Sequence, residues 1–374
     1  MRILVFSYSL LAGGAERVIS NLSNQWADDG HQVIIVTQQL VDSDFYKINR
    51  LVKRISLGTA KDSSNIGTAI LNNLMRLFML RKVFKTENPD VVISMMATTN
   101  VVSILSSRGL NVPIIACERT YPPHMPIGKG WSLLRRLTYP LAMRVIMLTS
   151  EGLDWLHREI PEAFGAVIPN SVVYPLPVSE PVINPENVVK KTSKVLLAVG
   201  RMSEEKGFSS LVGVFASLAH KNSEWVMVIL GNGPLYASLE KQIQIIGLED
   251  RVLMPGQVGN VGAWYERADL YVLSSRVEGF PNTLAEAMAH GCATLAFDCD
   301  TGPRDLIRHE IDGLLVPNAD FSSLAESLER LMQNDILREE MSVRALDVRN
   351  RFSMKRILSL WDSLFADIIG KFLK

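Results

Sequence analysis

Short runs of consecutive apolar residues alternate with longer amphipathic segments along the whole chain, and this alternation limits the possible folds more than any other feature. Runs such as residues 2–7, 32–37 and 225–230 leave almost no polar side chain for either face of a strand. Strands that are buried on both faces occur in parallel sheets covered by helices on both sides. We therefore predict an α/β fold in which parallel strands alternate with helices.

The alternation stops once, near the middle of the chain, and then restarts. Residues 173–193 carry four prolines and little periodicity, which indicates a linker between two domains. The chain has 374 residues, 47% of them hydrophobic, and this supplies enough apolar material for two cores. We expect doubly wound domains at residues 1–172 and 194–353, with a final helix at about residues 354–374 packing back on the first domain.

The expected elements follow from the same pattern. In doubly wound sheets ligands bind beyond the carboxyl ends of the strands, so two facing domains would place the site between them. We predict strands at 2–7, 32–37, 91–94, 113–117, 145–148, 195–200, 225–230, 252–254, 270–273, 293–297 and 314–316, and late helices at 321–333, 335–349 and 354–372.

A loop that leads into an Ala/Leu/Met-rich helix carries the most informative residues of the second domain. Pro281 suits the first turn of that helix, whose free N–H groups and dipole favour a phosphate. Glu278 lies in the loop and Glu286 lies in the second turn. Carboxylates repel a phosphate, but they accept hydrogen bonds from sugar hydroxyls. The pattern therefore indicates a ligand that contains both phosphate and sugar.

Two other turns from strand to helix carry residues suited to a phosphate. Arg201 and Lys206 follow the strand at 195–200 and could bind an anion, or they could pair with the two glutamates between them. Gly13 and Gly14 follow the first strand. Paired glycines allow the close approach of a ligand, but they also simply form tight turns.

Two predicted helices of the first domain, residues 74–85 and 129–139, combine large apolar residues with cations and contain no acid. Such helices can lie in the headgroup region of an anionic bilayer. The alternative is that their apolar faces pack on the sheet while the cations are solvated. The residues expected to contact a membrane surface, or a substrate presented at it, are Arg76, Arg81, Lys82, Lys129, Trp131, Arg135 and Arg136.

Several other kinds of protein are disfavoured. Three cysteines cannot form a disulfide framework, and the absence of an 18-residue apolar span predicts a cytoplasmic setting. The formal net charge is zero, and we expect no nucleic-acid partner. Asp298-Cys299-Asp300 mimics a metal-binding Asp-x-Asp motif, but paired Cys or His spacing is missing and no metal is expected. Gly231-x-Gly233 lacks the rest of a dinucleotide fingerprint.

The ordered set Gly13-Gly14, Gly200-Arg201…Lys206-Gly207 and Glu278-x7-Glu286 resembles the retaining glycosyltransferases of family 4. The resemblance covers essentially the whole chain. It implies the GT-B architecture, in which two Rossmann-like domains face each other across a cleft. The N-terminal domain would bind the acceptor and the C-terminal domain would bind the nucleotide sugar.

The same resemblance implies roles for individual residues. Arg201, Lys206 and Glu278 would form the catalytic set, with the two cations on the donor diphosphate and Glu278 on the sugar hydroxyls. Glu286 would bind the ribose, and residues 252–258 would hold the base. The donor-binding residues implied are Gly13, Gly14, Arg119, Gly200, Arg201, Lys206, Glu278, Gly279, Phe280, Pro281, Asn282, Thr283, Leu284 and Glu286.

One position departs from the family. Relatives often carry a histidine that contacts the donor sugar at the end of the strand where this chain has Arg119. His124, from the same loop, is an alternative contact, although an ordinary surface role fits it better.

The first domain most resembles bacterial enzymes that extend polyprenol-diphosphate-linked oligosaccharides. This implies a retaining, metal-independent hexosyltransferase that moves GalNAc, GlcNAc or a hexose from a UDP-sugar, without a cofactor, to a lipid-linked saccharide. It would act in lipopolysaccharide or capsule assembly, peripherally on the inner face of the cytoplasmic membrane. A UDP-sugar epimerase of the same architecture and a noncatalytic sugar-nucleotide-binding protein remain open as alternatives.

Overall fold

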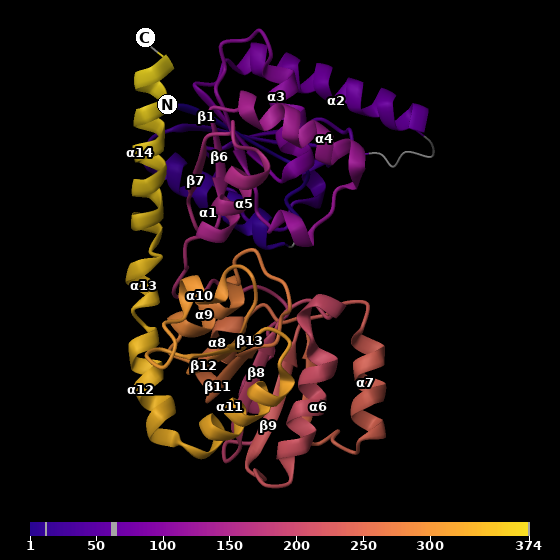
Figure 1. Ribbon diagram of the computed structural model, residues 1–374, viewed down its shortest axis with the longest axis vertical. Coiled ribbons are helices and arrows are strands. Elements are labelled where there is room, and N and C mark those ends of the chain that lie inside the picture. Colours follow the sequence, from indigo (N-terminus) through magenta and orange to yellow (C-terminus); the bar gives the residue numbers. More distant parts are fainter. Residues whose placement is uncertain (12, 61–65, 373–374) are drawn as a thin grey trace. The chain divides into compact units, whose positions relative to one another are not determined.

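The computed structural model describes residues 1–11, 13–60 and 66–372. The chain divides into two compact units: unit 1 comprises Met1–Asn170 and Ile357–Lys374, and unit 2 comprises Ser171–Arg356. Each unit is built on one parallel sheet with helices on both faces (Figure 1). The predicted α/β class with two doubly wound sheets is therefore confirmed.

Unit 1 contains a seven-stranded sheet with the strand order β3-β2-β1-β4-β5-β6-β7. Each neighbouring pair is parallel, so the carboxyl ends of the strands share one edge. The strands are β1 (Arg2–Ser7), β2 (Gln32–Thr37), β3 (Lys53–Ser56), β4 (Val91–Met95), β5 (Ile114–Cys117), β6 (Arg144–Met147) and β7 (Gly165–Val167), and the helices are α1 (Gly14–Asp28), α2 (Ile66–Glu87), α3 (Ala97–Ser107), α4 (Gly128–Thr138) and α5 (Ser150–Glu159).

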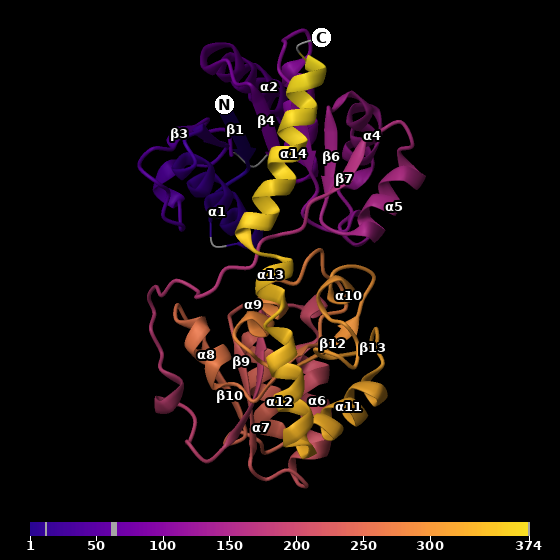
Figure 2. The ribbon, with the colours of Figure 1, turned by 90° about the vertical axis from the view of Figure 1, so that its left-hand side faces the viewer.

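The core of unit 1 follows the alternation of side chains along the strands. Leu4 and Phe6 of β1 belong to the cluster that α2, α3 and α5 cover. The opposite face receives α1 and most of the last helix, α14 (Met354–Phe372). Figure 2 shows α14 running along the elements of unit 1. Trp26 of α1 meets Trp361 of α14 edge to face, with ring centroids 5.6 Å apart. The C-terminal helix therefore completes the core of unit 1.

Unit 2 contains a six-stranded sheet with the strand order β10-β9-β8-β11-β12-β13, again with parallel neighbours. Its strands are β8 (Lys194–Val199), β9 (Trp225–Leu230), β10 (Val252–Gly256), β11 (Leu270–Leu273), β12 (Thr294–Asp298) and β13 (Leu314–Pro317). Its helices are α6 (Phe208–Ala219), α7 (Tyr236–Ile245), α8 (Val261–Arg267), α9 (Asn282–Ala289), α10 (Pro303–Leu306), α11 (Phe321–Gln333), α12 (Asp335–Ala345) and α13 (Val348–Arg351).

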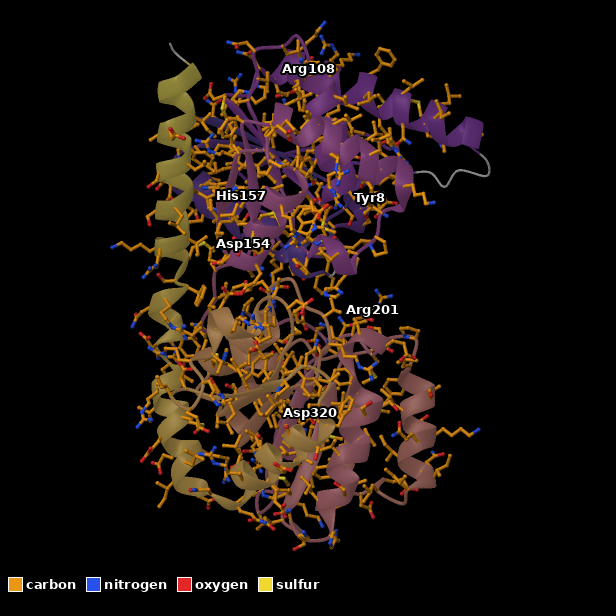
Figure 3. The ribbon with its side chains drawn as sticks, in the orientation of Figure 1. Tyr8, Arg108, Asp154, His157, Arg201 and Asp320 are labelled. Atoms are coloured by element: carbon orange, nitrogen blue, oxygen red, sulfur yellow. The ribbon has the colours of Figure 1, made fainter. Side chains whose placement is uncertain are left out.

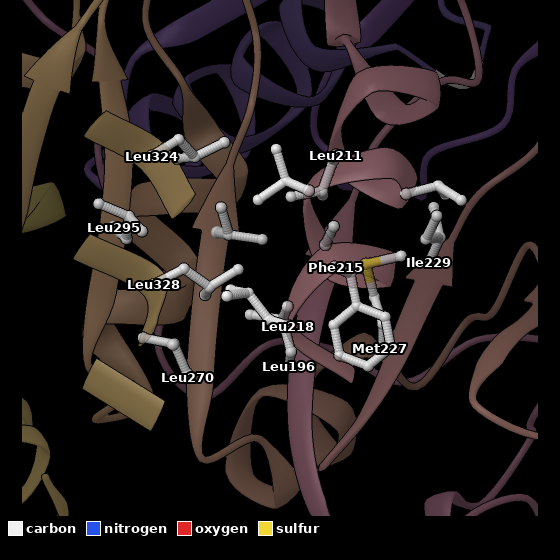
Figure 4. Packing of buried hydrophobic residues seen from close by; sticks show 14 of the residues in the cluster. Leu196, Leu211, Phe215, Leu218, Met227, Ile229, Leu270, Leu295, Leu324 and Leu328 are labelled. Carbon is white, nitrogen blue, oxygen red and sulfur yellow. The ribbon is translucent and has the colours of Figure 1, made fainter. Parts of the chain in front are cut away.

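Helices α6 and α11 pack on one face of the unit 2 sheet, and their apolar side chains form the core with those of the strands (Figure 4). Phe215 of α6 and Leu328 of α11 are fully buried beside Leu196 of β8. These apolar side chains hold the strands in register, and the loops after the strands are thereby fixed at one edge of the sheet.

Three details differ from the sequence-based expectations. β3 and β7 were not predicted, because these short outer strands are only partly buried and lack a continuous apolar run. The single helix expected at 335–349 is two helices, α12 and α13. Residues 173–193, expected to be a linker, lie in unit 2, where the Trp264 Nε1–H group donates a 2.9 Å hydrogen bond to the carbonyl of Ile183.

Candidate functional site

The carboxyl edge of the unit 2 sheet brings together residues that lie far apart in the sequence. Lys206 follows β8 in a short 3₁₀ helix, Glu204–Lys206, and Glu278 lies in the loop after β11. The Nζ atom of Lys206 lies 2.6 Å from Oε1 of Glu278. Both side chains are largely shielded from solvent, with exposures of 21% and 11%. The structure thus places two of the three predicted catalytic residues in direct contact.

The loop that carries Lys206 is anchored to the loop after β11 through backbone contacts. Ser274 Oγ donates to the carbonyl of Lys206 at 2.8 Å, and the N–H of Arg276 donates to the carbonyl of Glu205 at 2.8 Å. Gly207 makes this approach possible: its φ is +68°, and a Cβ there would lie 2.4 Å from the Ser274 carbonyl oxygen. Only glycine tolerates both conditions.

Replacing Gly207 by alanine is therefore expected to lower the free energy of unfolding by about 1–3 kcal/mol and to reduce turnover, because the loop bearing Lys206 must move. Thermal unfolding and a transferase assay measure both effects. Gly213 provides the matched control, since it is exposed within α6, has nothing near its Cβ position and should gain stability as alanine. Equal stability of the two alanine variants would contradict this account of Gly207.

The loop after β9 packs against the loop after β8 with almost no space between the backbones. A Cβ on Gly231 would lie 2.0 Å from the Gly200 carbonyl oxygen, and one on Gly233 would lie 2.5 Å from that of Met202. The Met202 N–H also donates to the Asn232 carbonyl at 2.9 Å. Gly231 and Gly233, which do not complete a dinucleotide fingerprint, therefore allow the close packing that supports the loop containing Arg201 and Lys206.

A third loop supports Glu278 from the other side. Thr301 Oγ1 donates to the backbone carbonyl of Glu278. A Cβ on Gly302 would lie 2.5 Å from Cδ of Pro281, so glycine is required there as well, at a φ of +99°. The loop containing Glu278, Gly279, Phe280 and Pro281 is consequently held between residues that follow β8 and β12.

Helix α9 begins at Asn282 directly after Pro281. The N–H of Leu284 donates to the Pro281 carbonyl at 3.1 Å. Of the three amides predicted to face a diphosphate, that of Leu284 is therefore already engaged by a tight first turn. The buried Tyr271 hydroxyl donates a 2.8 Å hydrogen bond to Thr283 Oγ1, which fixes the first turn against β11.

Glu286 lies deeper in the unit than the sequence suggests, with 5% exposure. The Tyr265 hydroxyl donates to its Oε2 atom at 3.1 Å. Burial, together with the negative charges of Glu278 and Glu286, raises the pKa of Tyr271, although the Thr283 hydrogen bond opposes this. Glu278 and Glu286 are therefore both largely buried, with side-chain or residue exposures of 11% and 5%. A hydrogen bond from a ligand hydroxyl to either carboxylate would be strong in this environment.

Arg201 is the exposed cation of the site, at the start of the loop after β8 (Figure 3). Burial would raise the pKa of Glu205, but hydrogen bonds from Ser203 and from its own backbone, together with the charges of Lys206 and Arg201, lower it on balance. Within the described part of the chain, neither predicted cation forms an ion pair with Glu204 or Glu205. Arg201 is thus available to an anion.

The predicted base-binding segment lies at β10. The Tyr236 hydroxyl donates to the Met254 carbonyl at 2.9 Å and connects this strand to α7.

Within residues 1–11, 13–60 and 66–372, there is no group of three His, Cys, Asp or Glu side chains that could hold a metal ion. In the same residues, no helix has the length and apolar character needed to cross a bilayer.

In unit 1 the predicted glycine pair lies at the start of α1, with Gly13 as the N-cap and Gly14 as the first helical residue. The Glu16 carboxylate folds over Gly13, where a Cβ would lie 2.2 Å from its Oε2 atom, and Ser9 Oγ donates to Oε1 at 3.1 Å. The Tyr46 hydroxyl donates to the Gly13 carbonyl at 2.9 Å. Gly13 therefore takes part in contacts within the protein, and its extended backbone does not itself require glycine.

Arg119 follows β5 and is 7% exposed. Its Nε and Nη2 atoms are buried without hydrogen-bond partners. Glu118, the preceding residue, accepts a short hydrogen bond from the Tyr139 hydroxyl and lies 3.7 Å from Arg135. His124, the alternative donor contact, is exposed and lies beside the Tyr121 ring at 5.4 Å.

Some of the basic side chains on α2 and α4 make contacts within unit 1. Arg76 donates to the Thr59 carbonyl at 3.0 Å, and Arg81 donates to the carbonyls of Ser106 and Arg108 at 2.9 and 2.6 Å. Arg135 lies 4.8 Å from the Trp155 ring centroid and near Glu118. These three arginines serve contacts within unit 1, because the protein offers them acceptors at close range. Lys82, Lys129 and Arg136 remain exposed, and Trp131 is half-buried.

Apolar side chains dominate the exposed surface of the same helices. We call this surface the α2/α4 face; α3 packs against both helices. Eight large apolar side chains form it, with exposures between 37% and 71%. They are Ile70, Leu71, Leu74, Met75 and Phe78 of α2 and Leu133, Leu134 and Leu137 of α4.

Several residues of the site escaped the sequence-based reasoning: Ser274, Thr301, Tyr265 and Gly302. Each acts through a contact with a residue at least 20 positions away, or with a backbone atom, and no local pattern marks such a residue. The positive-φ requirement of Gly302 is the one signal in the sequence, since a Gly-Pro pair indicates a turn.

Comparison with known proteins identifies the chain's relatives. Residues 12–173 match the family described as Glycosyltransferase Family 4, and residues 179–347 match Glycosyl transferases group 1. The chain is 29% identical, over 98% of its length and 99% of the relative, to the α-1,4-N-acetyl-D-galactosaminyltransferase of Campylobacter jejuni, named for a GalNAc-GalNAc-diNAcBac-PP-undecaprenol substrate.

Solved structures share the fold. Sucrose-phosphate synthase from Thermosynechococcus elongatus superposes with a TM-score of 0.84 at 18% identity, covering 99% of this chain and all of the other. HepE of Anabaena, solved with UDP, gives a TM-score of 0.78 at 17% identity, over 98% of this chain and all of that one. Both likenesses confirm the predicted GT-B fold class.

Proposed function

Because the chain belongs to the glycosyltransferases that pair a family 4 domain with a group 1 domain, we propose that it transfers a sugar from a UDP-sugar to a lipid-linked saccharide. GalNAc, GlcNAc or a hexose would be moved with retention of configuration and without a metal. The relative from Campylobacter jejuni acts on an undecaprenol-diphosphate-linked saccharide by its name, which supports this acceptor class.

One observation carries the donor site: Lys206 and Glu278, 72 positions apart, meet at 2.6 Å beside the start of α9. A cation, an acid and a helix N-terminus at one edge match the diphosphate and the sugar of a nucleotide sugar. Lys206, Arg201 and the first amides of α9 would bind the diphosphate. Glu278 would accept a hydrogen bond from the sugar, and the buried Glu286 would accept hydrogen bonds from the ribose.

The reaction breaks the bond between the anomeric carbon and the diphosphate oxygen while the acceptor hydroxyl forms the new bond on the same face. The acceptor proton passes to the departing diphosphate. Because the breaking bond leaves its electron pair on the diphosphate oxygen, negative charge grows there in the transition state, and fixed cations stabilise it. No protein nucleophile is required for this route, so the residues bind, orient and neutralise.

We also propose that the α2/α4 face rests on an anionic membrane, on the inner face of the cytoplasmic membrane where a lipid-linked acceptor would be presented. Large exposed apolar patches mark interaction surfaces. Residues 66–86 and 119–150 contain no Asp or Glu, and Lys82, Lys129 and Arg136 are exposed, although Arg136 lies 3.1 Å from Glu159 of α5. Apolar side chains beside exposed cations match the chemistry of an anionic bilayer.

Acceptor-dependent release of UDP, measured over a panel of UDP-sugars with a short-chain lipid-linked saccharide, tests the proposed transfer. We expect release to require the acceptor and to favour one sugar. Conversion of the donor sugar without an acceptor would identify an epimerase, and UDP-sugar binding without any release would identify a binding protein. Either result would reject the transfer.

A further inference from the structure

Arg119 is a buried cation that lacks a counter-charge. Its side chain is 7% exposed, and its Nε and Nη2 atoms have no partner. Within residues 1–11, 13–60 and 66–372, no carboxylate lies within ion-pair distance of it. A charge removed from water without a partner costs several kcal/mol, so structural arginines at such depth are normally paired.

The neighbouring acid does not neutralise it. Glu118 continues the ladder of β5, because its N–H donates to the Ile146 carbonyl at 2.9 Å. Its carboxylate is taken up by the Tyr139 hydroxyl and by Arg135 of α4. Successive side chains along an extended strand point to opposite sides, which separates Glu118 from Arg119. Burial also lowers the pKa of Arg119, in keeping with an unmatched charge.

The position of Arg119 favours an anionic ligand. It lies just beyond the carboxyl end of β5, the edge at which doubly wound sheets bind ligands. The preceding crossover reaches the same place, since the Met96 N–H donates to the Cys117 carbonyl at 2.9 Å. Helix α3 then begins without a side-chain cap, after Met96 at a φ of +81°. The start of α3 and the unpaired Arg119 therefore both follow strands that end at the same edge of the sheet, and a helix N-terminus and a cation each favour an anion.

We infer that Arg119 binds a phosphate group of a substrate, rather than making the sugar contact that the family resemblance implies for this position. This inference rests on the proposed transferase function, because both proposed substrates contain a diphosphate: the UDP-sugar and the lipid-linked saccharide. The planar guanidinium matches two phosphate oxygens at once, which a histidine cannot do. Binding would supply the counter-charge that the free protein lacks.

The test compares Arg119→Met and Arg119→Lys with the wild type in thermal unfolding and ligand binding. Arg158→Met, which removes an exposed arginine of α5, is the matched control. Without ligand, Arg119→Met should unfold at the same temperature as the wild type or higher, because it removes an unpaired charge. The probes are UDP and geranylgeranyl diphosphate, which represent the donor and the lipid-linked acceptor.

We expect Arg119→Met to lower the affinity for one or both probes by about 10- to 100-fold, and Arg158→Met to leave both affinities unchanged. Loss for UDP alone assigns the phosphate to the donor, loss for geranylgeranyl diphosphate alone assigns it to the acceptor, and loss for both indicates a shared site. Arg119→Lys keeps the charge without the fork and should lie between Met and wild type. If Arg119→Met does not fold, Arg119→Lys decides the same comparison.

Wild-type affinity of the folded variants for both probes would overturn the inference, whatever their thermal stability. That result would leave the transferase proposal intact, because acceptor-dependent UDP release by the wild type is measured separately. Conversely, if the wild type released no UDP while Arg119→Met bound a probe more weakly, the proposed function would be rejected but Arg119 would still be an anion-binding residue.

Discussion

Replacing Lys206 by methionine is expected to lower kcat by about 10²–10³-fold, with a smaller change in KM for the donor. The cation lies where negative charge would grow on the leaving diphosphate, and it is held there by Glu278 at 2.6 Å. Initial rates of acceptor-dependent UDP release, over a range of donor concentrations, measure the effect. Methionine preserves the apolar stem, so the change isolates the charge.

Lys221 supplies the control for Lys206, since it is also an ion-paired lysine of unit 2, 3.5 Å from Glu329, but 57% exposed. Lys221→Met should leave kcat unchanged and barely alter stability. Arg201→Ala should lower kcat without lowering the unfolding temperature, because the Arg201 side chain is exposed. If Lys206→Met and Arg201→Ala both kept wild-type rates, the assignment of the donor diphosphate would be wrong.

A double-mutant cycle separates catalysis from loop anchoring at the same pair. Glu278→Gln removes the acid but keeps a group that can hydrogen-bond to a sugar. If the ion pair only held two loops together, each single variant would lose stability and the losses would be coupled, while kcat would follow stability. We expect instead that kcat falls more for Lys206→Met than its unfolding temperature explains.

The triple substitution Leu71→Ser, Phe78→Ser and Leu137→Ser is expected to weaken binding to anionic liposomes by about 10²–10³-fold. Each side chain is more than half exposed in the protein. Partial burial of each in the bilayer contributes about 1–1.5 kcal/mol, and each 1.4 kcal/mol changes affinity tenfold. Co-sedimentation with vesicles at several lipid concentrations gives the partition coefficient.

The matched control removes three equally exposed apolar side chains from unit 2: Ile245→Ser, Ile336→Ser and Val343→Ser. This variant should bind vesicles as the wild type does. Residual binding of the α2/α4 variant should decrease with salt, since Lys82, Lys129 and Arg136 contribute about 1 kcal/mol each near an anionic surface. Equal loss in both triple variants would reject the membrane role of the α2/α4 face.

A second copy of the chain is the other possible occupant of the α2/α4 face. In that case the wild type would be a dimer without lipid, and only the α2/α4 variant would become a monomer. Light scattering after size exclusion distinguishes this outcome. A dimer that does not bind vesicles would contradict the membrane proposal.

The alternation of apolar runs and helices was enough to predict two parallel sheets and most element bounds. Strands such as β1, β2, β9 and β11 are buried on both faces, and their composition directly reflects this environment. The outer strands β3 and β7 failed because partial burial leaves a weak signal. The local sequence pattern therefore indicates how deeply an element is buried, and it predicts the outer strands of a sheet less reliably than the central ones.

The sequence by itself also indicated the class of ligand that we propose, because two acids around a helix start and two upstream cations can be recognised along the chain. Only the tertiary structure decided how those groups are used. Lys206 pairs with Glu278, Gly207 meets Ser274, and Arg76 and Arg81 donate to backbone carbonyls, while the Nε and Nη2 atoms of Arg119 find no hydrogen-bond partner among the described residues. The reason is physical: a side chain's partner is set by strand order and loop packing, which join residues tens of positions apart, whereas local periodicity specifies only which side of an element faces the core.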